Sequence, residues 1–151
     1  MTTYVDSSAL LKLYIAEPDS PTALALLESD PVLVTSWLSH VEVRRNLARV
    51  LDGTQLIKAR QQCDLDFDLM ALITLDEPRW RAAADIAEEL GVRSLDAIHL
   101  ACAQKLNINP LTFVTFDIRQ AQAARRMGFT VVGAEIRSAR VDEVGVALFE
   151  V

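Results

Sequence analysis

The chain of 151 residues carries 15 basic and 21 acidic residues, which gives a formal net charge of −6 at pH 7. This length fits one domain, with a core large enough to fold without disulfides or a structural metal. The acidic balance argues against a protein that coats nucleic acid through charge alone. No stretch approaches the roughly 18 uninterrupted apolar residues that a membrane helix needs.

In chain order, the hydrophobic pattern switches between the two-residue period of strands and the 3.6-residue period of helices. It predicts a strand at 2–5, helices at 7–16 and 22–28, a strand at 32–35, helices at 37–51 and 55–69, a strand at 73–75, helices at 79–90 and 94–106, a strand at 112–116, a helix at 118–127 and a strand at 130–132. Ser36 and Ser94 suit helix N-caps, Pro78 a first helical position, and Gly91 and Gly128 positions just past a helix end.

Strands that alternate with helices predict a parallel sheet covered on both faces. We therefore expect an α/β fold, a three-layer α/β/α sandwich around a central parallel sheet of about five strands, with residues 1–151 forming a single domain. The tail at 133–151 contains a strand-like segment, VGVALFEV, which the pattern does not place. In such sheets ligands bind beyond the carboxyl ends of the strands, where the strand order reverses.

Cysteine usage and the first residues of the chain bear on its compartment. Cys63 and Cys102 are the only cysteines and no Cys/His cluster has zinc-site spacing, so both are expected to be reduced core residues. The N-terminal MTTYVDSSALLKLY has no basic start before its apolar part, which is not the pattern of a secretory signal peptide. The sequence therefore predicts a cytoplasmic protein.

Two aspartates stand directly after predicted strands. Asp6 follows TYV and Asp117 follows TFVTF, so both are expected at the same edge of the sheet. Either one also suits the N-cap of the next helix, because its carboxylate accepts hydrogen bonds from free backbone N–H groups. The sequence leaves both roles open.

Two further acids lie within predicted helices. Asp96, in RSLDAIHLA, belongs to a helix that is apolar nearly all round and therefore buried. Its charge is stabilised there either by the positive end of its helix or by a ligand. Glu42, in SWLSHVEVRRNL, shares its helix face with Arg45 and Arg49, so it either forms a solvated pair with Arg45 or reaches the sheet edge.

The four acids, if they lie close together, form a candidate site for a metal ion. Converging carboxylates repel one another, and they either take up protons or require a cation. Hard oxygen ligands select Mg²⁺ or Mn²⁺ rather than zinc. The sequence thus predicts a metal-dependent phosphodiesterase site formed by Asp6, Glu42, Asp96 and Asp117.

These motifs in this order resemble the PIN domain family, in the form found in VapC toxins. The resemblance covers residues 4–132, and DAIHLA followed by a strand and a TxD motif is its most telling part. It implies an Mg²⁺-dependent endoribonuclease that acts as the toxin of a type II toxin–antitoxin pair, a VapB-type antitoxin as partner, RNA as substrate and a homodimer. The four acids are carried over as catalytic metal ligands, with Thr115 and, more weakly, Ser7 as supporting hydroxyls.

The expected mechanism is in-line hydrolysis by metal-activated water, which leaves 5′-phosphate and 3′-hydroxyl ends. A non-catalytic PIN-like binding scaffold is the main alternative. A metal-free ribonuclease that uses His40 and His99 is another, although both histidines suit structural positions. An aspartate-nucleophile phosphatase is disfavoured because Ser8 stands where that chemistry needs a second aspartate. The sequence assigns RNA contacts to no individual arginine.

Overall fold

The computed structural model describes residues 2–134, which form five strands and seven helices. The strands are β1 (Thr3–Val5), β2 (Leu33–Ser36), β3 (Ala71–Ile73), β4 (Thr112–Thr115) and β5 (Thr130–Gly133). The helices are α1 (Ser7–Leu11), α2 (Ser20–Glu28), α3 (Trp37–Val50), α4 (Gly53–Leu69), α5 (Glu77–Leu90), α6 (Ser94–Lys105) and α7 (Ile118–Arg126).

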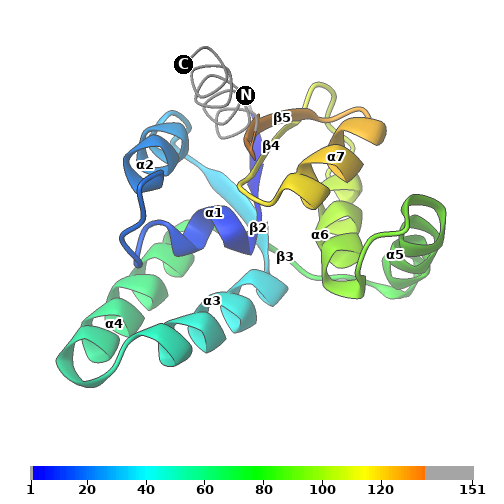
Figure 1. Cartoon of the computed structure of the whole chain (residues 1–151). Helices are drawn as coiled ribbons and strands as arrows, with labels where there is room; N and C mark the ends of the chain where they lie inside the picture. Colours follow the sequence, from blue (N-terminus) through cyan, green and yellow to red (C-terminus); the bar gives the residue numbers. More distant parts are fainter. Residues whose placement is uncertain (1, 135–151) are drawn as a thin grey trace, which may run out of the picture.

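The strands form one fully parallel sheet in the order β3-β2-β1-β4-β5. Helices α1 to α4 cover one face and α5 to α7 cover the other, as Figure 1 shows. Each face of the sheet carries its own hydrophobic core, and successive residues of β1 point to opposite faces. Tyr4 packs in the core on the α6 side, and Val5 packs in the core on the α1 side. This arrangement is the predicted three-layer α/β/α sandwich with a five-stranded parallel sheet.

The strand order reverses beside β1, since the chain runs from β1 to β2 and β3 on one side and returns to β4 and β5 on the other. Because all strands are parallel, their carboxyl ends share one edge of the sheet. Asp6 follows β1 and Asp117 follows β4, so these two acids flank the point at which ligands bind in sheets of this kind.

Several element boundaries differ from the prediction. Helix α1 is regular only to Leu11 and continues as turns, whereas the prediction ran to residue 16. Strand β3 lies two residues earlier than predicted, because a three-residue edge strand leaves little periodic signal. Ser36 occupies an N-cap position without a side-chain capping bond, and the N-cap of α6 is Arg93 rather than Ser94.

Both cysteines are free and buried, as predicted. Among residues 2–134, no helix is both long and apolar enough to cross a membrane. The strand-like segment near the C-terminus lies outside the described residues.

Candidate active site at the carboxyl edge of the sheet

Asp6 lies at the middle of this edge, with only 4% of its surface exposed. Its backbone N–H donates to the Val114 carbonyl at 3.2 Å, which fixes the residue between β1 and β4. Its Oδ1 accepts the Ala9 N–H at 3.2 Å and caps α1. The capping role expected for Asp6 is therefore real, yet it uses only part of the acceptor capacity of the carboxylate.

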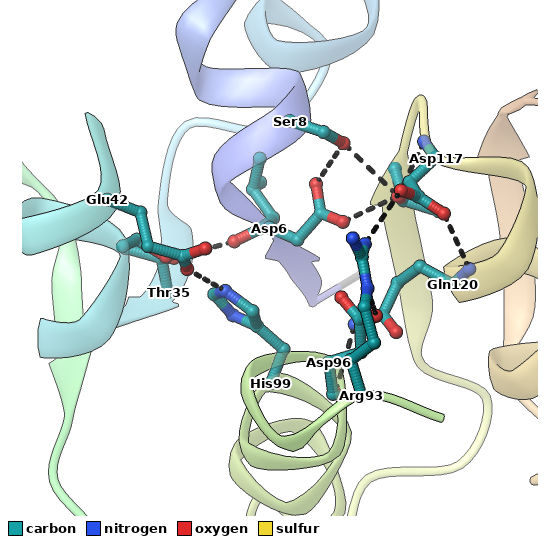
Figure 2. Close-up of polar contacts among 12 residues, drawn as sticks. Asp6, Ser8, Thr35, Glu42, Arg93, Asp96, His99, Asp117 and Gln120 are labelled. Atoms are coloured by element: carbon teal, nitrogen blue, oxygen red, sulfur yellow. Dashed lines mark hydrogen bonds and ion pairs between the residues drawn. The ribbon is translucent and has the colours of Figure 1, made fainter. Parts of the chain in front are cut away.

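Two hydroxyl groups donate hydrogen bonds to the Asp6 carboxylate, and Figure 2 labels that of Ser8. Thr115 Oγ1 donates to Asp6 Oδ2 at 2.5 Å, and Ser8 Oγ donates to Asp6 Oδ1 at 2.6 Å. The Ser8 hydroxyl in turn accepts the Phe116 N–H at 2.9 Å. The sequence singles out Ser7 as a supporting hydroxyl, whereas the one that contacts Asp6 belongs to Ser8.

Arg93 joins the two other aspartates. Its Nε donates to Asp96 Oδ2 at 2.9 Å, and its terminal nitrogen lies 3.4 Å from Asp117 Oδ2. Asp117 also caps α7, because its Oδ1 accepts the Gln120 N–H at 3.0 Å. The Gln120 side chain donates to the Asp96 backbone carbonyl at 3.2 Å and so ties the start of α6 to α7. A cation therefore already bridges two of the four predicted acids.

Glu42 turns toward α6 rather than toward Arg45. Its Oε1 lies 2.6 Å from His99 Nε2, and His99 Nδ1 lies 2.9 Å from the Tyr4 hydroxyl. His99 is 2% exposed and Tyr4 is fully buried. The His99 tautomer with a proton on Nε2 donates that proton to the Glu42 oxygen. Glu42 is thus held by a chain of polar groups that is anchored in the core beneath β1.

The four acids share one electrostatic environment. Burial raises the pKa of Asp6, while the His99 imidazole and the two hydroxyls act in the opposite direction. The pKa of Arg93 is raised by its hydrogen bond to Asp96 and by the charges of Asp96, Asp117 and Glu42. In the view of Figure 2, Asp6 lies between Glu42 on one side and the Arg93 cluster on the other.

The donor set suits a hard dication, because four separate segments of the chain bring carboxylate oxygens to the same edge of the sheet, with Asp6 buried among them. As they stand, no three His, Cys, Asp or Glu side chains within residues 2–134 are placed to hold one metal ion. Three of the acids bind basic side chains instead: Asp96 and Asp117 bind Arg93, and Glu42 binds His99. The Arg93 guanidinium lies between two carboxylates, and its side chain is 66% exposed.

The sequence suggests His99 only as part of a metal-free alternative, and it predicts neither Arg93 nor His99 as a partner of the acids. The burial of His99 is visible in the apolar stripe of its helix, but its partner Glu42 is 57 residues away in sequence and leaves no local signal. His40 lies elsewhere, because its ring contacts Asp64 on α4 at 3.3 Å. The two histidines therefore do not form an acid–base pair.

The architecture and the buried carboxylate at the strand-order reversal define the class: an α/β domain with an acidic site at the carboxyl edge of its sheet. The sequence model of the PIN domain matches residues 3–126. Ribonuclease VapC47 of Mycobacterium tuberculosis is 37% identical over 134 residues, covering 83% of this chain and 92% of the relative. Ribonuclease VapC46 of the same species is 33% identical over 132 residues, covering 85% and 95%. The chain belongs to the PIN domain family.

Solved structures share the fold. VapC20 of Mycobacterium tuberculosis, a sarcin–ricin loop cleaving toxin, superposes with a TM-score of 0.66 at 20% identity, covering 81% of this chain and 95% of that one. FitAcB from Neisseria gonorrhoeae gives a TM-score of 0.66 at 20% identity, with coverage of 86% and 96%. A toxin–antitoxin complex from Klebsiella pneumoniae gives 0.66 at 18% identity, with coverage of 87% and 96%.

Proposed function

We propose that this protein is a metal-dependent endoribonuclease that acts as the toxin of a type II toxin–antitoxin pair. The observation that carries the proposal is the buried Asp6 at the strand-order reversal, with Glu42, Asp96 and Asp117 arranged around it from three other elements. Relatives named as VapC ribonucleases, at up to 37% identity, support this chemistry.

Asp6, Asp96, Asp117 and Glu42 are the residues that would hold Mg²⁺, with Mn²⁺ as a substitute. When bound, the ion supplies an activated water nucleophile and stabilises the charge that develops on the leaving oxygen. Thr115 and Ser8 orient the Asp6 carboxylate through their hydrogen bonds, and His99 orients Glu42. Arg93 must give up at least one carboxylate before both Asp96 and Asp117 face an ion, because it binds both.

The test is cleavage of end-labelled RNA by the purified protein with Mg²⁺ and with EDTA. We expect cleavage in the presence of Mg²⁺ and none in EDTA, with 5′-phosphate and 3′-hydroxyl product ends. Asp6→Asn and Asp96→Asn should lose activity, since removing one ligand costs several kcal/mol of transition-state stabilisation. Asp85→Asn removes an exposed acid of α5 and serves as the matched control, with activity unchanged.

Two other outcomes would overturn this assignment. Cleavage that survives EDTA and leaves cyclic phosphate would favour a metal-free mechanism. Absence of cleavage across a broad set of cellular RNAs, together with retained RNA binding, would favour a non-catalytic binding scaffold.

The proposed partners are an RNA substrate, a VapB-type antitoxin and a second copy of this chain, with the cytoplasm as location. A toxin–antitoxin complex from Klebsiella pneumoniae contains a chain with this fold, which supports an antitoxin partner. Co-expression with a short adjacent reading frame should relieve toxicity if that frame encodes the antitoxin. Light scattering should give twice the chain mass of 16.7 kDa if the protein is a dimer.

A further inference from the structure

A cavity of about 310 Å³ lies beside the acids, between α7 and the turn that joins α5 to α6. Three arginines line it: Arg93 from the turn, and Arg119 and Arg126 from α7. The cavity also contacts Asp96, which binds Arg93 at 2.9 Å. It therefore adjoins the candidate active site and shares two residues with it.

Helix α7 places its basic residues along one line. Arg119, Gln122 and Arg126 have the i, i+3 and i+7 spacing of a single helix face, and all three are exposed. The two arginines are about 10.5 Å apart along the helix axis, at 1.5 Å per residue. Asp117 caps the start of the same helix. The row of arginines thus runs away from the acids, with Arg119 nearest to them.

The arginines differ in their partners. Arg93 is committed to Asp96 and Asp117. Within the part of the chain that the structure describes, no ion pair joins Arg119 or Arg126 to a carboxylate. Two guanidinium groups without a carboxylate partner therefore line the cavity next to the site, in a protein whose net charge is −6.

The lining of the cavity indicates how a ligand is recognised. The other side chains that line the cavity are those of Leu90, Val92, Gln122 and Ala123. Among the residues that the structure describes, the lining therefore offers no aromatic ring on which a base could stack. The guanidinium group matches the geometry of phosphate oxygens with two parallel hydrogen bonds. The chemistry therefore suits a phosphodiester backbone read independently of base sequence.

We propose that this cavity binds backbone phosphates of RNA that flank the bond to be cut, with Arg119 and Arg126 as the contacts. The inference rests on the proposed ribonuclease function, because a substrate that lies across the acids must leave the site over an adjacent surface. This cavity is one such surface, because it shares Arg93 and Asp96 with the acids. An acidic protein segment is the rival occupant and becomes an outcome of the test.

The experiment measures the binding of a fluorescein-labelled single-stranded RNA of twelve nucleotides by anisotropy, at several salt concentrations. It is run in EDTA and also with Mg²⁺ in an Asp6→Asn background, so that binding is measured without cleavage. The variants are Arg119→Gln, Arg126→Gln and the double variant. Lys58→Gln, which removes one exposed positive charge from α4 on the other side of the sheet, is the matched control (Figure 1).

Each phosphate contact on a single strand contributes about 0.7 to the slope of log affinity against log salt. Each arginine variant should therefore reduce the slope by about 0.7 and weaken binding roughly fivefold at 0.1 M salt. The double variant should show both losses combined, the effect should be equal across RNA sequences, and Lys58→Gln should change neither quantity.

Unchanged affinity and slope in Arg126→Gln would overturn the proposal, and so would failure of the parent protein to bind RNA in either buffer. If the arginine variants lose affinity for a polyglutamate peptide but not for RNA, the cavity belongs to an acidic protein segment instead. If RNA binds through the arginines but no RNA is ever cut, the proposed activity fails, while the assignment of the cavity as a phosphate-binding surface stands.

Discussion

The hydrogen-bonded chain from Tyr4 through His99 to Glu42 gives a prediction whose size follows from burial. His99→Leu replaces the imidazole with an apolar side chain. It removes the partner of a fully buried tyrosine hydroxyl and the partner of a carboxylate whose side chain is 21% exposed. Glu42 regains hydrogen bonds from water, whereas the Tyr4 hydroxyl does not.

The expected cost is therefore set mainly by Tyr4. A buried polar group left without a partner costs about 1–3 kcal/mol. We therefore expect His99→Leu to lower the free energy of unfolding by an amount within this range. For a chain of this size, each kcal/mol lowers the melting temperature by about 2–4 °C.

A double-mutant cycle by urea unfolding tests the contact itself. Tyr4→Phe alone leaves the His99 Nδ1 without a donor, but in the double variant both groups of the pair are gone, which is close to neutral for that pair. The two costs should thus be less than additive by at least about 0.5 kcal/mol. Additive costs would refute the buried bond, and no loss in His99→Leu would refute the reasoning from burial.

Three further predictions concern the surroundings of the acids. Burial raises the pKa of Asp6 above its ordinary value of 3.8, so the folded metal-free chain holds the proton of the Asp6 carboxyl more tightly than the unfolded chain does. The free energy of unfolding should therefore fall as the pH rises from about 3.8 through the raised pKa. Asp6→Asn should abolish this decline, and unfolding at pH 4 and pH 7 shows whether it does. Gly133 has φ +107° and its added Cβ would press on the Thr115 carbonyl, whereas Gly91 at φ +64° faces open space. Gly133→Ala should therefore destabilise the protein by more than the roughly 1 kcal/mol expected for Gly91→Ala, and equal melting temperatures would contradict this. Arg93→Ala should change the free energy of unfolding by less than about 1 kcal/mol, because the Arg93 side chain is exposed in its ion pairs. The same change releases Asp96 and Asp117, so Mn²⁺ should bind several-fold more tightly when binding is measured by electron paramagnetic resonance. Weaker Mn²⁺ binding would contradict the view that Arg93 competes with the ion.

The sheet and its acidic edge were predictable because their signals are local. Asp6 and Asp117 each follow a run of apolar residues that reads as a buried strand, and parallel strands bring their carboxyl ends to one edge. Their capping roles were visible for the same reason. The two functions proposed from the sequence, capping and ligand binding, are compatible in one carboxylate because it has more than one acceptor site.

The partners of the acids were not predictable because they are set by tertiary packing. Arg93 reads as an exposed residue ahead of a helix, and nothing local shows that Asp117, 24 residues later, lies within reach of it. Ser7 and Ser8 are neighbours in sequence, yet their side chains differ by about 100° around the α1 axis. Only the path of the chain from β1 into α1 decides that Ser8 contacts Asp6.

A crystal grown with Mn²⁺ would show whether these acids form a metal site, because anomalous scattering locates the ion independently of any activity. We expect an anomalous peak bound by Asp6, Asp96 and Asp117 oxygens, with Arg93 turned away from at least one of them. Carboxylates that keep their present partners at saturating Mn²⁺, with the metal absent from this edge or bound elsewhere, would contradict this expectation.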